Sequence, residues 1–306
     1  MEKTAKSVFN SKRRSEIKFI TLSLIYPMII FAIFYLYVNF NSIMLSMKTL
    51  NDNGKFVFAD DLLVNFKKTF RLLTSEFELT RGLRNTTIVY LYGIFINQPF
   101  QIIISYYMWR KIPLNGFFRV VIFIPSIVST MVYVTIGRYI FTEIIPLIVG
   151  NPKLRLLTDP STQFVSVFIY SILIGVGGNI VYYLGAISSV DASVVEYGKL
   201  DGLNSFGELW HIVLPHVWPT MISFIIVTTS QFFTEKLMLY DFFGGGVEPS
   251  ASTLGYYYFR LVFSNNTLNV GQYPEGAAAG LIFTIIAVPF TFGFKYLLER
   301  FGPSED

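Results

Sequence analysis

Residues that could catalyse a reaction or hold a metal ion are scarce in this chain of 306 residues. It contains no cysteine, and its two histidines, His211 and His216, are five positions apart. Residues at that spacing do not share a face of a helix, so a metal site on this pair is not expected. The Gly-x-x-x-x-Gly-Lys-Ser/Thr sequence that cradles nucleotide phosphates is also absent. The sequence therefore predicts that the chain is not an enzyme and binds neither a cofactor nor ATP itself.

Two serine–glutamate pairs lie close together in one polar segment. Ser193 is followed three residues later by Glu196, and Ser205 is followed three residues later by Glu208. In such a capping box the serine hydroxyl accepts a hydrogen bond from the backbone N–H of the third helical residue, and the glutamate reaches back to the N–H of the cap. The two pairs therefore predict the starts of two short helices.

The segment 188–216 that carries these pairs is longer than the roughly 2 to 8 residues that usually connect packed helices. We expect its first helix to run over about 194–201 and to end at Gly202, because glycine readily takes the left-handed conformation that ends helices. The second helix leads towards Pro215. Such a folded segment would suit contact with a protein partner, although the same helices could simply connect two larger elements.

Elsewhere, uncharged polar side chains interrupt long apolar runs. Such groups are unfavourable in hydrocarbon unless they face the interior of a helix bundle, so they are candidates for lining a solute passage. Hydrogen bonding between neighbouring helices is the competing explanation for each of them. The polar candidates are Asn97, Gln98, Gln101, Asn179 and Gln231, and the rings of Tyr170, Tyr182 and Phe232 lie near them in sequence.

The elements that must position these residues are apolar helices. Hydrophobic residues make up 53% of the chain, charged residues 14%, and the mean hydropathy is +0.52, whereas soluble domains carry about 25% charged residues. A helix crosses about 30 Å of hydrocarbon with about 20 apolar residues. The runs long enough are 19–40, 87–109, 120–141, 164–187, 217–239 and 277–298. We predict an all-α, polytopic membrane protein with six transmembrane helices and a single membrane domain.

Basic residues near these runs predict the orientation, since cationic loops stay on the cytoplasmic side. They are Lys3, Lys6, Lys12, Arg13, Arg14 and Lys18 before the first run, and Arg110, Lys111 and Arg119 after the second. The tails 1–18 and 299–306 and the segment 188–216 are therefore predicted to be cytoplasmic. The first run is long for a signal peptide and no small-residue cleavage site follows it, so we expect a retained helix.

The spacing within the segment 188–216 carries a family resemblance. Glu196 is followed by Gly202 after six residues and by Ile212, Leu214 and Pro215 after ten more, in the pattern I-x-L-P. This pattern resembles the EAA loop of the membrane subunits of ATP-binding-cassette importers. Its place between the fourth and fifth runs also agrees with that family.

The resemblance implies that the first helix of this loop docks onto a separate ATPase. Glu196 would anchor the docking helix, and Gly202 would set the angle between the two helices; the alternative for Glu196 is a cap and nothing more. The chain departs from the family pattern where Tyr197 and Gly198 replace two alanines. The positions assigned to coupling are Ser193, Glu196, Tyr197, Gly198, Asp201, Gly202, Ile212, Leu214 and Pro215.

A second resemblance concerns the substrate. The glycines 244–246 are followed by Pro249, Thr253, Leu254 and Tyr257, which looks like the G-G-G-P…T-L…Y signature of the sugar-importing subfamily, with two residues inserted before the proline. Asn65 with Phe66, and the segment 276–280, are placed as in the maltose-type membrane subunits. The chain is thus similar to the carbohydrate-uptake, maltose-type permeases over roughly residues 20–300.

The resemblance implies a set of partners in a bacterial cell membrane. These are a second, homologous permease that forms a heterodimer with this chain, two ATPase subunits that bind ATP and Mg²⁺, an extracellular sugar-binding protein, and a sugar or oligosaccharide as substrate. No nucleic-acid partner is expected. The eight polar and aromatic candidates would then line the sugar's path, because sugars present hydroxyls beside an apolar ring face.

Three other functions remain compatible with the sequence. The chain could belong to an importer of a non-sugar solute, or it could be a secondary transporter, a class that tends to show internal repeats and broken membrane helices. Neither feature is evident in the sequence. A membrane scaffold that uses the loop only for binding is the third alternative.

Overall fold

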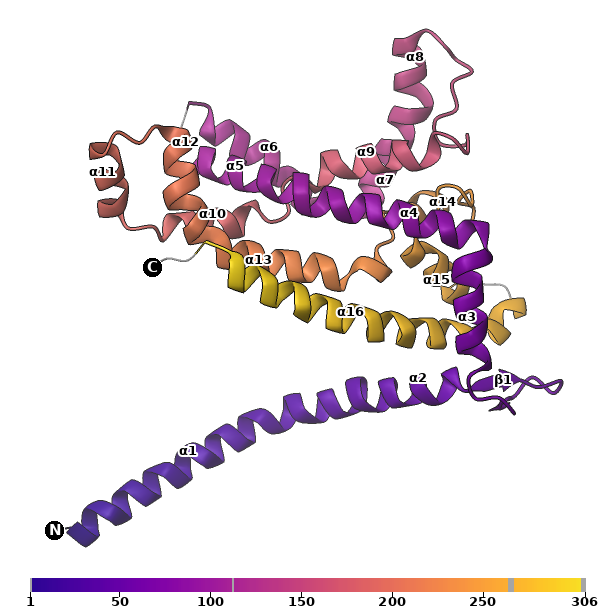
Figure 1. Ribbon diagram of the computed structural model, residues 1–306, viewed down its shortest axis with the longest axis horizontal. Helices are drawn as coiled ribbons and strands as arrows, with labels where there is room; N and C mark the ends of the chain where they lie inside the picture. Colours follow the sequence, from indigo (N-terminus) through magenta and orange to yellow (C-terminus); the bar gives the residue numbers. More distant parts are fainter. Residues whose placement is uncertain (1, 112, 264–266, 304–306) are drawn as a thin grey trace. The chain divides into compact units, whose positions relative to one another are not determined.

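The computed structural model describes the backbone of residues 2–111, 113–263 and 267–303 (Figure 1). Among the described residues, six helices are long and apolar enough to cross a membrane: Glu16–Ser46, Phe77–Trp109, Thr130–Val149, Gln163–Ser188, Ser205–Ser230 and Val270–Phe301. The only sheet in the described part of the chain is a two-stranded hairpin. The predicted all-α, six-helix fold class is confirmed, whereas residues 1 and 304–306 of the predicted tails lie outside the described residues.

The chain forms two compact units, and the smaller one comprises residues 1–68 and 271–281. It contains a continuous helix made of α1 (Glu2–Ile30), η1 (Phe31–Tyr37) and α2 (Val38–Ser46). The antiparallel strands β1 (Lys48–Leu50) and β2 (Phe56–Phe58) follow, with Lys48 opposite Phe58. Asn65 fastens the hairpin to the helix end, because its amide donates to the carbonyls of Ser46 and Lys48, each at 2.8 Å.

The larger unit, residues 69–270 and 282–306, begins within α3 (Val64–Ser75). Its first long helix joins α4 (Phe77–Tyr92), the π-helical segment η2 (Gly93–Asn97) and α5 (Gln98–Trp109). The π-helical turn ends two residues before Pro99. Proline lacks an N–H and its ring collides with the carbonyl four residues earlier, so a locally widened turn lets the helix continue through it.

The predicted third span, 120–141, is not one helix. The structure has α6 (Asn115–Ile127), then Val128 and Ser129 in extended conformations, then α7 (Thr130–Tyr139), η3 (Ile140–Ile144) and α8 (Ile145–Val149). Ser129 is the N-cap residue of α7, the position that serine prefers to a helix interior. The candidate span therefore shifts to 130–149.

The predicted fourth span, 164–187, is also interrupted. It consists of α9 (Gln163–Gly175) and α10 (Ile180–Ser188), separated by a turn at 176–179. Gly177 packs so tightly that an added Cβ would collide with the backbone carbonyl of Ile122 in α6. Glycine weakens a helix by about 1 kcal/mol per residue relative to alanine, which explains why the glycine-rich stretch opens here. Broken membrane helices, which are not evident in the sequence, are therefore present in the structure.

The predicted fifth span, 217–239, starts and ends too late. A continuous helix runs through α12 (Ser205–Glu208), η4 (Leu209–Val213) and α13 (Leu214–Ser230), so the second short helix predicted in the loop is the beginning of the span itself. After the 3₁₀ turn η5 (Phe232–Thr234), Leu237 and Met238 take positive φ values of 51° and 53°, which end helical structure before α14 (Leu239–Phe243).

The remaining helices are α15 (Leu254–Phe263), the 3₁₀ helix η6 (Thr267–Gln272) and α16 (Tyr273–Phe301), which extends the predicted sixth span at both ends. In the larger unit α10 packs between α5 and α13, as Figure 1 shows. Tyr183, Ile187, Val213 and Val217 form the fully buried centre of this contact. A second core gathers α7, α9, α14 and α15 around Tyr170, Phe242 and Tyr256.

Candidate functional site

The loop between α10 and α13 contains α11 (Ala192–Leu200), which has an N-cap other than the one predicted. A carboxylate oxygen of Asp191 accepts from the Ser193 N–H at 2.9 Å, and this hydrogen bond lowers the pKa of Asp191. At the next helix Asn204 accepts from the Gly207 N–H at 2.8 Å. The serine capping boxes are therefore wrong, because aspartate and asparagine stand just upstream and cap helices at least as well as serine.

The end of α11 is the predicted glycine elbow. Gly202 has a φ of 81°, and its N–H donates to the Lys199 carbonyl at 3.1 Å. The N–H of Leu203 donates to the Gly198 carbonyl at 2.9 Å. These two bonds form a Schellman motif, which satisfies the last carbonyls of the helix after the C-cap residue Asp201.

Gly198 has a packing role that its low helix propensity does not suggest. A Cβ added there would lie 2.7 Å from Ile212 Cδ1 and 3.1 Å from Leu203 Cδ1. The glycine thus lets α11 approach η4. Leu214, just after η4, packs against the core formed by α5, α10 and α13, and Pro215 is the next residue. Three of the predicted coupling residues, Gly198, Ile212 and Leu214, therefore form the base that holds α11 in place.

The opposite side of the loop presents apolar side chains to its surroundings. Tyr197 is 67% exposed and Leu200 is 81% exposed, while Glu196 lies beside them, also exposed. Phe206 and Trp210, which stack with ring centroids 6.3 Å apart, are exposed on the neighbouring helix. Leu200, Phe206 and Trp210 were not identified from the sequence. They could have been found because they are large apolar residues in a segment that is predicted to lie outside the membrane.

A buried polar cluster fastens this loop to the end of α5. Glu208 is 3% exposed, and its carboxylate accepts from the Tyr106 hydroxyl at 3.0 Å and lies 3.5 Å from Arg110 Nη1. Arg110 also donates to Ser205 Oγ at 2.8 Å. In the sequence, Arg110 indicated only the orientation in the membrane, and Glu208 was expected only to cap a helix. Their pairing needs two segments about a hundred residues apart, so no local pattern could reveal it.

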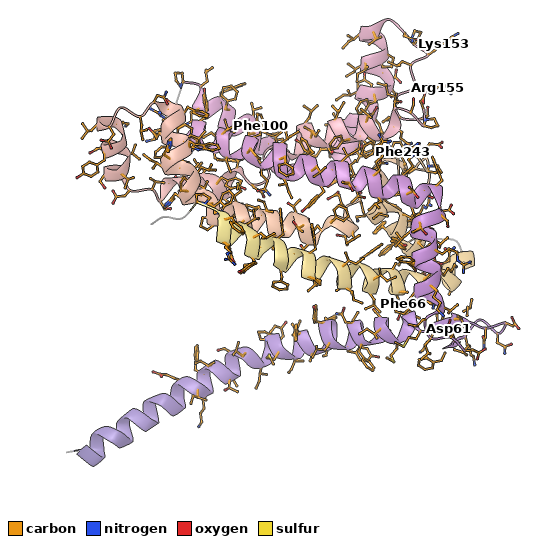
Figure 2. All side chains as sticks on the ribbon, viewed as in Figure 1. Asp61, Phe66, Phe100, Lys153, Arg155 and Phe243 are labelled. Atoms are coloured by element: carbon orange, nitrogen blue, oxygen red, sulfur yellow. The ribbon has the colours of Figure 1, made fainter. Side chains whose placement is uncertain are left out.

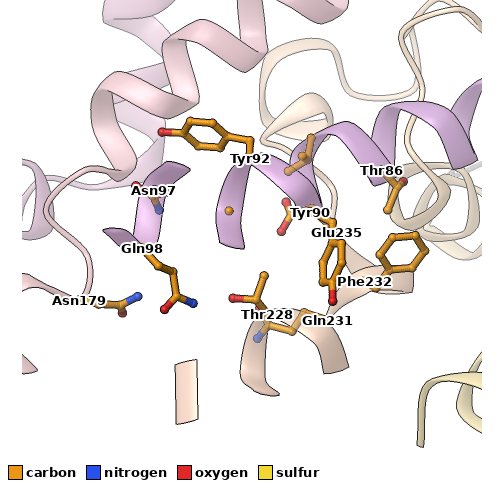
Figure 3. Close-up of a pocket in the computed structure, with 12 residues that line it drawn as sticks. Thr86, Tyr90, Tyr92, Asn97, Gln98, Asn179, Thr228, Gln231, Phe232 and Glu235 are labelled. Carbon is orange, nitrogen blue, oxygen red and sulfur yellow. The ribbon is translucent and has the colours of Figure 1, made fainter. Parts of the chain in front are cut away.

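A cavity of about 190 Å³ lies among α4, α5, the break before α10 and the end of α13 (Figure 3). Five predicted substrate-path residues line it: Asn97, Gln98, Asn179, Gln231 and Phe232. The lining residues that the prediction missed are Thr86, Val89, Tyr90, Tyr92, Gly93, Thr228 and Glu235. The π-helical turn η2 and the α9–α10 break place the polar side chains there, since Asn97 ends η2 and Asn179 is the N-cap residue of α10.

Polar groups in this cavity have unused hydrogen-bonding capacity. Gln98 is 2% exposed, and its Oε1 accepts from the Tyr183 hydroxyl at 2.6 Å. Its Nε2 and the Oδ1 of Asn97 are buried without a hydrogen-bond partner among the described residues. Tyr90 meets Phe232 edge-on at 5.2 Å, so aromatic surface stands beside these groups. A buried donor or acceptor without a partner is unfavourable, and both of these atoms belong to residues that line the cavity.

Three predicted path residues do not line the cavity. Gln101 donates to the Val176 carbonyl at 3.2 Å and so bridges α5 to the break after α9. Tyr170 donates to the Tyr133 carbonyl at 2.6 Å within the second core. Tyr182 is 63% exposed and packs on Phe224 with centroids 5.4 Å apart. Hydrogen bonding between helices, the competing explanation, accounts for Gln101 and Tyr170, whereas Tyr182 shows only a ring contact with α13.

The glycine segment before α15 supports the rim of the cavity. Gly244 has a φ of 58°, and its carbonyl accepts from the Tyr256 hydroxyl at 2.9 Å. Thr253 Oγ1 donates to the Glu235 carbonyl at 2.8 Å, and the Leu254 N–H donates to Thr86 Oγ1 at 3.1 Å. Two lining residues, Glu235 and Thr86, are thus held by this segment. The preceding loop between α8 and α9 carries Lys153 and Arg155 (Figure 2).

The two histidines hold local hydrogen bonds. His211 Nδ1 lies 3.0 Å from the Gly207 carbonyl oxygen, and His216 Nε2 lies 2.9 Å from Ser189 Oγ. Within the described ranges, no three His, Asp or Glu residues gather in a way that could hold a metal ion.

Comparison with known proteins places this geometry in a family. Residues 93–304 match the family described as binding-protein-dependent transport system inner membrane component. The chain is similar to the lactose transport system permease protein LacF of Rhizobium radiobacter, with 27% identity over 76% of this chain and 79% of the relative. It is similar to the multiple sugar-binding transport system permease protein MsmF of Streptococcus mutans, with 24% identity over 86% and 89% of the two chains.

Solved structures agree with the fold. A chain of a bacterial alginate ABC transporter, crystallised with an alginate pentasaccharide-bound periplasmic protein, matches with a TM-score of 0.72. The identity is 17%, and the match covers 95% of this chain and 98% of that one. With a family match across more than half of its length and six apolar helices, this chain belongs to the inner membrane components of binding-protein-dependent transport systems.

Proposed function

We propose that this chain is the permease subunit of an ATP-driven importer and forms, with a second homologous permease, the translocation path for a sugar or oligosaccharide. The observation that carries the proposal is the cavity beside η2, in which amide groups with unused hydrogen-bonding capacity stand next to aromatic rings. Sugars need this combination of neutral hydrogen-bonding groups and apolar faces. The names of the relatives, which include lactose and multiple-sugar systems, support the same substrate class.

The coupling element in this proposal is α11 with the adjoining part of α12 and η4. Its exposed apolar side chains Tyr197, Leu200, Phe206 and Trp210 form a surface that a partner protein would cover. We assign that surface to one of two ATPase subunits, which bind ATP and Mg²⁺. Gly198 packs α11 against η4, and the Arg110–Glu208 pair joins α12 to the end of α5, so movement of the ATPase would be transmitted to α5 and α13.

The remaining partners and the orientation complete the proposal. The basic residues of the N-terminal tail favour cytoplasmic termini in a bacterial cell membrane, with α11 on the same side. An extracellular sugar-binding protein would deliver the substrate to the other side. The family description, which specifies dependence on a binding protein, supports that partner.

The test is transport by the full complex in proteoliposomes that contain both permeases, the ATPase subunits and the binding protein. ATP-dependent accumulation of a radiolabelled sugar supports the importer. Accumulation driven by an ion gradient without ATP would instead support a secondary transporter, a class that the broken α6–α7 and α9–α10 helices also suit. Assembly of the complex without transport of any solute would support a membrane scaffold. ATP-driven uptake of non-sugar solutes alone would overturn the sugar assignment.

The docking assignment has its own test. Leu200→Glu places a charge on the exposed face of α11 and Glu196→Lys reverses one there, and neither side chain contributes to the buried base of the helix. Both variants should insert normally but lose copurification with the ATPase or lose sugar-stimulated ATP hydrolysis. A comparable change away from the loop, Lys153→Glu between α8 and α9, is the control. Wild-type assembly and coupling in both loop variants would contradict docking at this face.

A further inference from the structure

Glu235 contributes the only carboxylate among the residues that line the cavity. It is partly buried and lies just after the end of α13, at the edge of the cavity beside Tyr90 in Figure 3. Apart from Glu235, the lining consists of neutral polar and aromatic residues with one valine and one glycine. An ionisable group at such a place indicates a functional role more often than a structural one.

The position of this carboxylate is fixed by its surroundings. Its Oε1 accepts from the backbone N–H of Leu237 at 2.8 Å, and Thr253 Oγ1 donates to the Glu235 carbonyl at 2.8 Å. Gly255 packs directly against the Thr234–Glu235 backbone, where a Cβ would overlap main-chain atoms. The backbone of Glu235 is therefore held beside the cavity, and the Leu237 N–H orients one of its two carboxylate oxygens.

Glu235 has no ion-pair partner among the described residues. The adjacent Lys236 turns away, with its Nζ 3.9 Å from the ring centre of Phe259. No lysine or arginine of the described residues forms an ion pair with Glu235, in contrast to the partly buried Glu78, which Arg260 contacts at 2.8 Å. The cavity therefore has a net negative charge at its rim.

The Glu235 carboxylate can distinguish a ligand hydroxyl from a ligand carboxylate. A sugar hydroxyl can donate a hydrogen bond to the Glu235 carboxylate, whereas a ligand carboxylate can only accept. Two carboxylates within a few ångströms repel each other, and the repulsion is stronger near a protein interior than in water. A uronate unit would thus lose one hydrogen bond and gain a repulsive contact.

We propose that the cavity takes an uncharged sugar unit and rejects carboxylated sugars, with Glu235 as the residue that sets this selection. The inference rests on the proposed function and narrows it to neutral sugars. From the like-charge contact we expect a preference on the order of tenfold or more for a neutral sugar over its uronate counterpart.

The test measures ligand binding to the detergent-solubilised complex of both permeases and the ATPase subunits, without the binding protein, by saturation-transfer NMR. The probes are lactose, maltose and cellobiose, each paired with the disaccharide in which the terminal CH₂OH is oxidised to a carboxylate. The wild-type complex should prefer the neutral member of every pair that binds. Glu235→Gln should bring that preference close to one, and Glu248→Gln, a carboxylate outside the cavity, should leave it intact.

The outcomes separate the inference from the proposed function. Equal binding of both members of a pair by the wild type, or an unchanged preference in Glu235→Gln, would overturn the role of Glu235 while leaving a sugar permease. If none of the six probes binds and the complex also accumulates no sugar with ATP, the proposed function falls, and the inference falls with it.

Discussion

Arg110 and Glu208 form an ion pair that joins the end of α5 to the first turn of the fifth span, with Nη1 of Arg110 3.5 Å from Oε2 of Glu208. Glu208 is nearly fully buried, whereas the Arg110 side chain is 29% exposed. The pair lies at the base of the loop that carries the exposed face of α11. It is therefore the point at which the proposed ATPase docking and the movement of the spans can be separated experimentally.

Arg110→Ala should uncouple ATP hydrolysis from transport. The substitution leaves the buried Glu208 carboxylate without its cation, and breaking such a pair destabilises a protein by about 3 to 5 kcal/mol when it is fully buried, so a smaller loss applies to this partly exposed one. Sugar-stimulated ATPase activity of the reconstituted complex is the measurement. Arg110→Ala combined with Glu208→Gln should recover part of the coupling, since it removes the uncompensated charge. A double variant as impaired as the sum of the two single variants would show that the pair does not act as a unit.

Gly255→Ala should destabilise the larger unit and weaken sugar binding together. The new methyl group would overlap the backbone of Thr234 and Glu235, which cannot rotate away as a side chain could. Overpacking of this kind costs about 1 to 3 kcal/mol. Gly185→Ala in α10 is the matched control, because nothing lies within 4 Å of its added Cβ. Thermal unfolding of the purified complex should fall for the first variant alone, and equal melting temperatures in both would contradict the close packing at Gly255.

Gly202→Ala should loosen the end of α11, whereas Gly202→Asn should be tolerated. The φ of 81° places residue 202 in the left-handed region, which costs an ordinary residue roughly 1 to 2 kcal/mol but is more accessible to asparagine. Space is not limiting, because no atom lies within 4 Å of the added Cβ. Copurification with the ATPase should therefore follow the order glycine, asparagine, alanine. The reverse order for asparagine and alanine would indicate that helix propensity, and not the elbow, determines docking.

The protection of α11 against hydrogen exchange should depend on pH through Asp191. The Ser193 N–H lowers the pKa of this carboxylate in the folded loop, so its stabilising effect is fully present above the unfolded value of about 4. The effect is lost as the pH falls through the lower folded-state pKa. Asp191→Asn keeps an acceptor and should remove the pH dependence, and Asp191→Ala should expose the amides of α11 to faster exchange at neutral pH. An identical pH profile in the wild type and Asp191→Asn would rule out the carboxylate as the source.

Several helix boundaries depend on details that an apolar run does not show. The runs 120–141 and 164–187 meet the length needed to cross a membrane, yet each is divided between two helices. Prolines 99, 146 and 215 each follow a π-helical turn by two residues, and this pattern does have a local cause in the missing proline N–H. The break at Gly177 has a tertiary cause in addition to the low helix propensity of glycine, because the close carbonyl of Ile122 belongs to another helix.

The candidate site also combines features that follow from the sequence with features that depend on tertiary packing. Side-chain type and depth identified Asn97, Gln98, Asn179, Gln231 and Phe232, but they identified Gln101, Tyr170 and Tyr182 equally well. Which of these face the cavity depends on the rotation of each helix, which the π-helical turn and the α9–α10 break change locally. Glu235 lies near the end of the predicted fifth span, and contacts with the distant Thr253 and Gly255 hold it at the rim of the cavity.

The sequence by itself determined that this chain folds as six apolar helices and carries a capped helix that ends at Gly202, since hydropathy and the left-handed preference of glycine act within a few residues of the chain. The tertiary structure alone decided that Gly198 is a contact surface, that Arg110 pairs with Glu208, and which polar side chains share one cavity. Those outcomes require segments distant in sequence to meet, and their packing, not any local propensity, selects the partners.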